Sequence, residues 1–224
     1  MAYILAFEGI DGTGKGTQAQ LLHNRLTALG YSCLQVSFPN YESFIGREIG
    51  ALLSGRHGTT AATLDPKSMA LWFAAERMRT FKDIDQSVYD FIVLNRYIMS
   101  NIVYQSLRVA ADERPAFTQW VFELEYGQFG LPHPDLTFVF EVDEHLSSAN
   151  VSQKGYREYT GNTPDVYEAS GTTQTNARQL YRQLAHQHTN TMLIECMAAS
   201  GTMRPAQDIS DTVFAAVQPQ LSKY

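Results

Sequence analysis

The chain has 224 residues, of which 44% are hydrophobic and 18% charged, a balance typical of a globular protein rather than a disordered or fibrous one. Its formal net charge of -6 argues against a surface that coats nucleic acid, because such a surface needs clustered Lys and Arg. No apolar run is long enough to cross a membrane, and the apolar N-terminus has no basic region, so we interpret it as a strand rather than a signal peptide.

Five apolar runs of strand length recur along the chain, separated by segments with helical spacing. This alternation predicts an α/β fold, a three-layer α/β/α sandwich around a parallel five-stranded sheet. We expect a single domain over residues 1–224. The runs are Tyr3–Phe7, Cys33–Phe38, Phe91–Leu94, Leu136–Val142 and Met192–Cys196.

Most segments between the runs are predicted to be helices. Residues 18–29 have helical leucine spacing, and another helix should begin at Asp65 and Pro66, because proline is favoured at the first helical position. Residues 54–66 are predicted to be a surface loop. Residues 151–175 contain almost no aliphatic side chains and can bury little apolar area, so we predict that they are mobile.

The two cysteines, Cys33 and Cys196, each lie in a short apolar stretch. A free cysteine in such a stretch usually behaves as a small buried hydrophobic residue. Free thiols are expected in a reducing compartment, so we predict a cytoplasmic protein.

A glycine-rich loop follows the first predicted strand and opens the first predicted helix. Strand, glycine loop, lysine and helix occur in the order that a P-loop requires. Small residues let consecutive backbone N–H groups converge on phosphate oxygens, and Lys15 adds a full positive charge at the β- and γ-phosphates. The sequence therefore predicts ATP binding. The residues assigned to ATP are Gly9, Ile10, Asp11, Gly12, Thr13, Gly14, Lys15, Gly16 and Thr17.

Gly16 departs from the usual motif, which has Ser or Thr as a magnesium ligand directly after the lysine. The hydroxyl comes one residue later at Thr17, and Gly-Lys-Gly-Thr-Gln resembles the variant found in adenylate kinases. In such a loop Mg²⁺ is held through water and the phosphates of the nucleotide, with Glu8 and Asp11 near its water shell. We expect ATP and Mg²⁺ without a direct side-chain metal ligand.

The segment FEGIDG at residues 7–12 resembles the opening of the thymidylate kinases. Similar segments follow at residues 38–41 (FPNY), 71–77 (LWFAAER) and 94–105 (LNRYIMSNIVYQ), so the resemblance spans nearly the whole chain. It implies transfer of the γ-phosphoryl of ATP to thymidine monophosphate. The family usually forms homodimers through packed helices; the aromatic-rich residues 117–129 could make that contact, or could be core.

The resemblance also implies an acceptor site. Phe73 would stack on thymine and Arg77 would bond a base carbonyl; they are four residues apart, on one helical face, where a ring and a donor fork can read a base. Arg96 would hold the acceptor phosphate at the carboxyl edge of the sheet, and Tyr41 would favour a deoxyribose. The substrate-binding set is Asp11, Phe38, Tyr41, Phe73, Arg77, Arg96, Ser100, Asn101, Tyr104 and Gln105.

Residues 151–165 fall where the family has a lid that closes over ATP. Because Thr13 stands in the P-loop where some members carry arginine, we expect the catalytic arginine to come from this lid, with Arg157 as the first choice and Lys154 as the second. Catalysis then reduces to alignment and charge stabilisation. The lid positions are Lys154, Arg157, Asp165 and Glu168, and the predicted catalytic residues are Lys15, Arg96 and Arg157.

Asn40 and Asn95 stand where the family has arginine and aspartate. Losing one charge-assisted hydrogen bond at residue 95 costs about 1.5–3 kcal/mol, or roughly tenfold to a hundredfold in rate. With Gly16, these changes leave two alternatives open: a kinase for another deoxynucleoside monophosphate or a modified pyrimidine, and a weakly active nucleotide sensor or scaffold. A P-loop ATPase acting on nucleic acid is disfavoured by the acidic balance.

Overall fold

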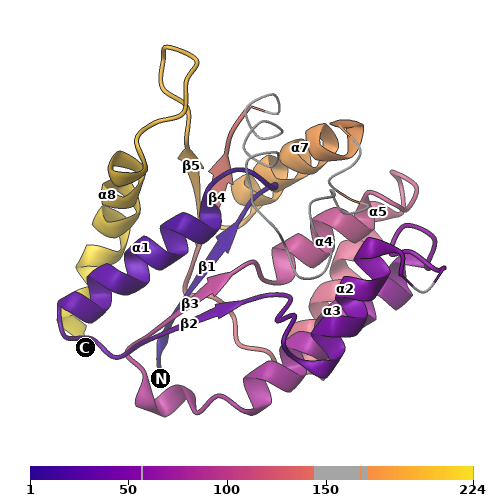
Figure 1. Ribbon diagram of the computed structural model, residues 1–224, viewed down its shortest axis with the longest axis horizontal. Coiled ribbons are helices and arrows are strands. Elements are labelled where there is room, and N and C mark those ends of the chain that lie inside the picture. The colour runs from indigo at the N-terminus through magenta and orange to yellow at the C-terminus, as the bar shows by residue number, and fades with distance from the viewer. Residues whose placement is uncertain (57, 144–166, 168–170, 224) are drawn as a thin grey trace.

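The computed structural model describes residues 1–56, 58–143, 167 and 171–223. Its centre is a five-stranded parallel sheet in the order β2-β3-β1-β4-β5 (Figure 1). Each strand begins and ends within one residue of a predicted apolar run, which confirms the predicted sheet. The strands are β1 (Tyr3–Glu8), β2 (Cys33–Ser37), β3 (Phe91–Asn95), β4 (Leu136–Glu141) and β5 (Thr191–Glu195).

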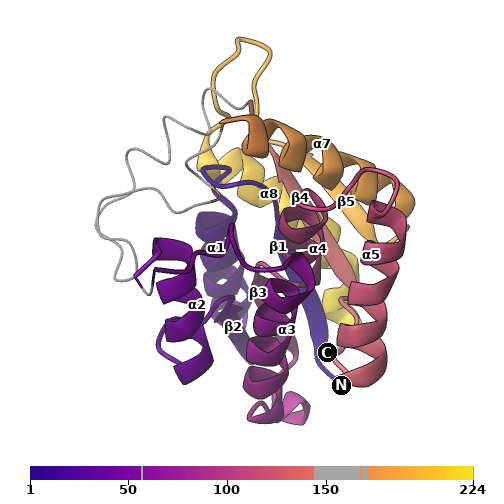
Figure 2. The same ribbon diagram turned by 90° about the vertical axis from the view of Figure 1, so that its right-hand side faces the viewer.

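Helices cover both faces of the sheet, as the three-layer prediction requires (Figures 1 and 2). Side chains of β1 alternate between the faces: Leu5 and Phe7 join one buried cluster, and Ile4 and Ala6 join the other. One face is covered by α1 (Lys15–Ala28) and α8 (Ala206–Val217), and the other by α4 (Ile98–Ser106) and α7 (Gly171–Gln187), extended by α2 (Phe44–Ser54), α3 (Pro66–Lys82) and α5 (Arg114–Phe122).

Two helices begin at side-chain caps that bear on the site. Asp65 accepts a hydrogen bond from the Ser68 N–H at 2.9 Å, and Pro66 follows it at the first position of α3, as predicted. At the start of α2, the Ser43 hydroxyl accepts from the Gly46 N–H at 2.9 Å. The loop predicted before α3 is present, although Ala61 within it is fully buried.

The aromatic-rich residues 117–129 include a π-helix, η2 (Glu123–Gln128), that continues directly from α5. Phe117 is buried, and Phe122 and Tyr126 stack with ring centroids 5.7 Å apart against the same core. Core packing therefore accounts for these rings. Two further short helices are η1 (Gln86–Val88) and η3 (Gln218–Lys223).

Both cysteines are free, as predicted. Burial raises the pKa of each thiol, Cys33 and Cys196, to about 12, so neither is a thiolate at neutral pH. None of the described helices has the length and apolarity that crossing a membrane demands.

Candidate active site

The P-loop joins the end of β1 to the start of α1 at the carboxyl edge of the sheet. Gly9, Gly12 and Gly14 have positive φ angles of 137°, 77° and 82°. A Cβ atom on Gly9 would lie 2.6 Å from the carbonyl oxygen of Phe140, so no larger residue fits there. Gly14 caps α1 without a side-chain bond, which leaves the N-terminus of that helix open to an anion.

Lys15 lies across the loop rather than out in solvent. Its side chain is 7% exposed, its Nζ donates to the Ile10 carbonyl at 3.0 Å, and Nζ lies 3.8 Å from Asp11 Oδ1. The Thr13 hydroxyl donates to the same carbonyl at 3.1 Å. The lysine charge is therefore held at the surface of the loop that the phosphates would contact.

Arg96 links the P-loop to the neighbouring strand end. Its φ of 66° is unusual for a non-glycine residue. Its Nη2 donates to Asp11 Oδ1 at 2.6 Å, and its Nη1 donates to the Gly9 carbonyl at 3.3 Å and to Ser100 Oγ at 3.1 Å. Burial alone would lower the pKa of the guanidinium, but Asp11, together with smaller contributions from Tyr104, Tyr181 and Glu8, raises the pKa above its usual value. A permanent cation thus lies at the carboxyl edge of the sheet.

Glu8, at the end of β1, serves as a cap for α4. Its carboxylate accepts from the Tyr97 N–H at 2.8 Å and from the Ser100 N–H at 3.1 Å. It also accepts from the hydroxyls of Ser100 and Tyr181. Both oxygens are engaged, and a carboxylate at a helix N-terminus is favourable. The part predicted for Glu8 near a metal's water shell stays a prediction.

One cavity brings together all ten residues predicted to bind the acceptor. They come from the P-loop, the turn after β2, α3 and the segment from Arg96 into α4. Convergence in space does not test their roles, which stay predictions. The lining consists of these ten (Asp11, Phe38, Tyr41, Phe73, Arg77, Arg96, Ser100, Asn101, Tyr104 and Gln105) together with Pro39, Leu53 and Tyr167.

Arg77 forms a buried ion pair that the sequence did not reveal. Its Nε and Nη2 each donate to one oxygen of Glu125 at 2.6 Å, and both side chains are at most 2% exposed. Asn101 Nδ2 donates to the same carboxylate at 2.8 Å and to the Ala70 carbonyl at 3.0 Å. Burial alone would lower the pKa of Arg77, but Glu125 raises it. Arg77 and Glu125 are 48 positions apart, so no local pattern pairs them.

Tyr167, like Glu125, lies at the site but was not predicted from the sequence. Its ring stacks on Tyr104 with centroids 5.4 Å apart, and Gln105 Nε2 donates to its hydroxyl at 3.0 Å. It is 8% exposed and lines the acceptor cavity. The one available signal is that it is an aromatic residue in a stretch with almost no aliphatic ones.

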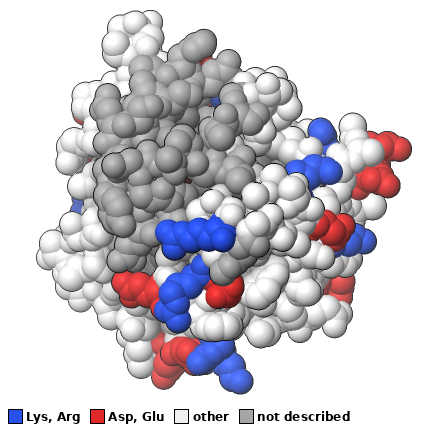
Figure 3. Space-filling view, turned by 45° about the vertical axis from the view of Figure 1, so that its right-hand side comes forward, with Lys and Arg blue, Asp and Glu red and all other residues white. Residues whose placement is uncertain are grey.

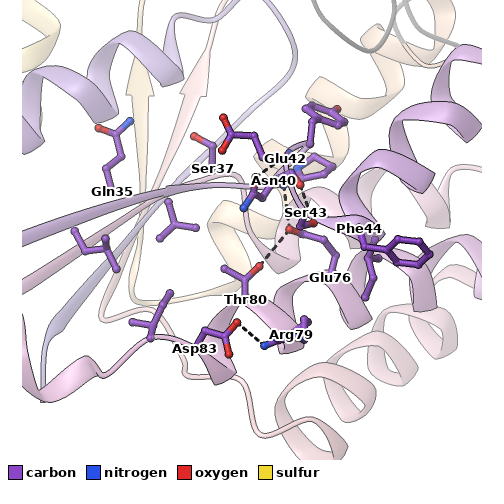
Figure 4. Close-up of a pocket in the computed structure, with 16 residues that line it drawn as sticks. Gln35, Ser37, Asn40, Glu42, Ser43, Phe44, Glu76, Arg79, Thr80 and Asp83 are labelled. Carbon is purple, nitrogen blue, oxygen red and sulfur yellow. Dashed lines mark hydrogen bonds and ion pairs between the residues drawn. The ribbon is translucent and has the colours of Figure 1, made fainter.

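Asn40 faces a second hollow, of about 1130 Å³, along the outer edge of β2 (Figure 4). Its backbone N–H donates to Glu76 Oε1 at 3.0 Å, and its Oδ1 accepts from the Glu42 N–H at 3.1 Å. Burial raises the pKa of Glu76. Arg47 donates to the Glu42 carbonyl at 2.6 Å and is not among the residues that line the acceptor cavity, so it does not replace the missing arginine there.

The other two departures from the family, Gly16 and Asn95, lie side by side. A Cβ atom on Gly16 would be 3.5 Å from Asn95 Nδ2. That nitrogen donates to Ser37 Oγ at 3.3 Å, while Asn95 Oδ1 is buried and has no hydrogen-bond partner in the described ranges. The predicted lid at 151–165, including Lys154, Arg157 and Asp165, lies outside the described residues, as does Glu168.

The parallel sheet, the glycine loop at its carboxyl edge and the lysine at the start of α1 define a P-loop nucleotide-binding protein. The family model for thymidylate kinase matches residues 7–200. The chain is 30% identical to the thymidylate kinase of Mycobacterium tuberculosis over 188 residues, which cover 82% of this chain and 86% of that protein. It is 34% identical over 163 residues to a probable thymidylate kinase of Pyrobaculum aerophilum, covering 70% and 73%.

Solved structures share the fold. A thymidylate kinase from Candida albicans superposes with a TM-score of 0.75 at 21% identity, covering 98% of this chain and 92% of that one. One from Ehrlichia chaffeensis gives 0.68 at 19% identity, covering 96% and 98%. The chain belongs to the thymidylate kinase family. The predicted family, fold and enzyme class, an ATP-dependent nucleoside monophosphate kinase, are confirmed.

Proposed function

We propose that the chain transfers the γ-phosphoryl of ATP to thymidine 5′-monophosphate (dTMP), giving the diphosphate and ADP. The hydrogen-bonding groups of Asn101 and Arg77 favour thymine as the base. Asn101 Oδ1 is a buried acceptor with no partner in the described ranges, and Arg77 Nη1 makes no hydrogen bond there, while both residues line the cavity. Thymine offers an N3–H donor beside the O4 acceptor, which complements this pair. Cytosine offers the reverse pattern, so the pair disfavours it.

The phosphates would meet two cations. Arg96 lines the cavity, and its bond to Asp11 holds the guanidinium at the cavity wall. The acceptor phosphate would replace Asp11 as the partner of this guanidinium. Lys15 would exchange the Ile10 carbonyl for the β- and γ-phosphates of ATP. A phosphate acceptor is largely a dianion at neutral pH and needs little general-base help, so aligning and neutralising the two substrates is the main task.

Mg²⁺ fits this site through water rather than through a direct carboxylate. Glu8 Oε1 accepts from the N–H groups at the start of α4 and its Oε2 accepts from two hydroxyls, while Asp11 Oδ1 pairs with Arg96. The buried Oδ1 of Asn95, which has no hydrogen-bond partner among the described residues, is an acceptor suited to a metal-bound water. When bound, Mg²⁺ would neutralise charge on the β- and γ-phosphates. Arg157 remains our proposed lid arginine, on resemblance alone.

We also propose a homodimer. Leu71, Trp72 and Met78 on α3 are 46%, 37% and 37% exposed, and a second copy could cover these apolar side chains. Light scattering of the purified protein tests this; a monomer at micromolar concentration contradicts it. Where the structure describes the face in Figure 3, basic and acidic side chains lie interspersed, so these described residues form no continuous basic patch for nucleic acid. The cytoplasmic location stays a prediction.

The reaction is tested by measuring ADP release with Mg-ATP and each of five acceptors, the monophosphates of thymidine, deoxyuridine, deoxycytidine, deoxyadenosine and deoxyguanosine, with a control lacking acceptor. We expect the highest kcat/KM with the thymidine compound and loss of turnover by at least about a hundredfold in Lys15→Ala. Preference for another acceptor supports the alternative kinase. Nucleotide binding without turnover supports the sensor or scaffold, and normal turnover by Lys15→Ala refutes the assignment of that lysine.

A further inference from the structure

We infer that Glu125 is a positioning residue that sets the base specificity of the acceptor site. This inference rests on the proposed function, because it concerns how the same cavity reads thymine. Glu125 does not line the cavity; it acts through Arg77 and Asn101, which do. It is 0% exposed, and its two oxygens receive three donors from two different helices, α3 and α4.

The first effect of Glu125 is on the amide of Asn101. Nδ2 has two acceptors, Glu125 Oε1 at 2.8 Å and the Ala70 carbonyl at 3.0 Å. Only the NH₂ end of an amide can donate to both, so the amide cannot flip without setting oxygen against oxygen. The carbonyl Oδ1 is therefore the end left for a ligand, and it is buried without a partner in the described part of the chain.

The second effect is on the guanidinium of Arg77. The carboxylate binds the Nε and Nη2 edge in the bidentate manner, which fixes the plane of the fork as well as its charge. Nη1 is then the nitrogen left to donate into the cavity that Arg77 lines. One buried carboxylate thus holds both the residue that offers the acceptor and the residue that offers the donor, the pair that would recognise an N3–H and an O4 atom.

Glu125 lies in the π-helix η2 (Glu123–Gln128), where its side chain is buried. Glu123, on the same helix, is exposed and accepts from Gln128 Nε2 at 2.8 Å. π-Helical turns are rare and often occur at functional sites. Glu123 therefore provides a matched control on the same turn, with the same charge and outside the lining of the acceptor cavity.

The test compares Glu125→Gln with Glu123→Gln by measuring kcat and KM for dTMP and for deoxycytidine monophosphate (dCMP). The amide introduced by Glu125→Gln must place an NH₂ group against a donor of Arg77, so the fork loses its fixed orientation. We expect the ratio of kcat/KM for dTMP to that for dCMP to fall at least about tenfold in Glu125→Gln. The change should lie mainly in KM for dTMP, with KM for ATP unchanged. Glu123→Gln should retain the wild-type ratio.

A ratio of two substrates is independent of the fraction of enzyme that is folded, so partial unfolding alone cannot produce the expected result. Glu125→Asp provides a second variant that keeps the charge opposite Arg77 but is too short to serve all three donors, and it should also lower the ratio. An unchanged ratio in either variant overturns the inference. A wild-type enzyme that does not phosphorylate dTMP instead overturns the proposed function, so the two failures are distinct.

Discussion

At the scale of single residues, Gly16 and Asn95 are neighbours, and their effects on rate should therefore be coupled. Asn95→Asp restores a negative charge near the expected metal and should raise kcat by about tenfold to a hundredfold. Gly16→Ser finds ordinary contact distance beside Asn95, with 3.5 Å between the new Cβ and Nδ2. Residues in contact typically interact by about 0.5–3 kcal/mol. The double variant should deviate from the product of the single effects by that amount.

Steady-state kinetics of the wild type, the two single variants and the double variant, at saturating Mg²⁺, completes this double-mutant cycle. Strictly multiplicative effects contradict the placement of the two residues against each other. No gain in Asn95→Asp counts against the alignment of residue 95 with the aspartate of the family.

Glu76 should make stability depend on pH. Burial raises the pKa of Glu76, so the folded state binds this proton more tightly than the unfolded state. Its stabilising contribution is complete below the unfolded pKa of about 4.3 and is lost as pH rises through the folded pKa. Glu76→Gln keeps an oxygen for the Asn40 N–H and removes the ionised form. Glu76→Gln should have a higher Tm than the wild type at pH 8, and this difference in Tm should shrink as pH falls toward 4.

Thermal unfolding followed by circular dichroism at several pH values measures this difference. Glu42→Gln, which removes another carboxylate from the same hollow, is measured alongside as the control. A Tm difference for Glu76→Gln that does not vary with pH would show that Glu76 does not titrate as described.

At the scale of elements, the turn after β2 is fixed by the start of α2. A Cβ atom on Gly46 would lie 1.8 Å from the Asn40 carbonyl oxygen, and backbone cannot yield as a side chain does. Gly46→Ala should therefore lower the free energy of unfolding by about 1–3 kcal/mol or more, despite the better helix propensity of alanine. It should also raise KM for the acceptor, because Phe38 and Tyr41 line the cavity.

Gly127→Ala is the matched control for this variant. The nearest atoms to its Cβ would be those of the Glu123 carboxylate, an exposed side-chain end that can turn aside. Chemical denaturation and acceptor titrations of both variants give the comparison. Equal stability for Gly46→Ala and the wild type contradicts the close approach.

The strands were predictable from sequence because each is a short apolar run, and the central ones are apolar on both faces. The cap Asp65 and the proline Pro66 at the start of α3 were also predictable, because their signal is local. Glu125 was not, because a glutamate in an aromatic-rich stretch says nothing about a partner 48 positions away. Tyr167 lies 62 positions from Gln105 and was missed for the same reason.

At the scale of the whole molecule, the expected single domain over residues 1–224 predicts one cooperative thermal transition. A nucleotide that binds only the folded state at 100 times its Kd should stabilise it by about 2.7 kcal/mol and shift that transition as a whole. Calorimetry with and without ADP tests both points. Two separate transitions, of which only one moves with ADP, would mean that the chain contains independent folding units.

We expect phosphoryl transfer to dTMP to occur in the cavity between the P-loop and α3. Phosphorus NMR of the wild-type protein with Mg-ATP and dTMP follows every phosphate directly. We predict that dTDP and ADP appear in equal amounts while the ATP γ-phosphate signal declines, with no free phosphate formed. Release of free phosphate without dTDP, or an unchanged spectrum despite nucleotide binding, would contradict the account.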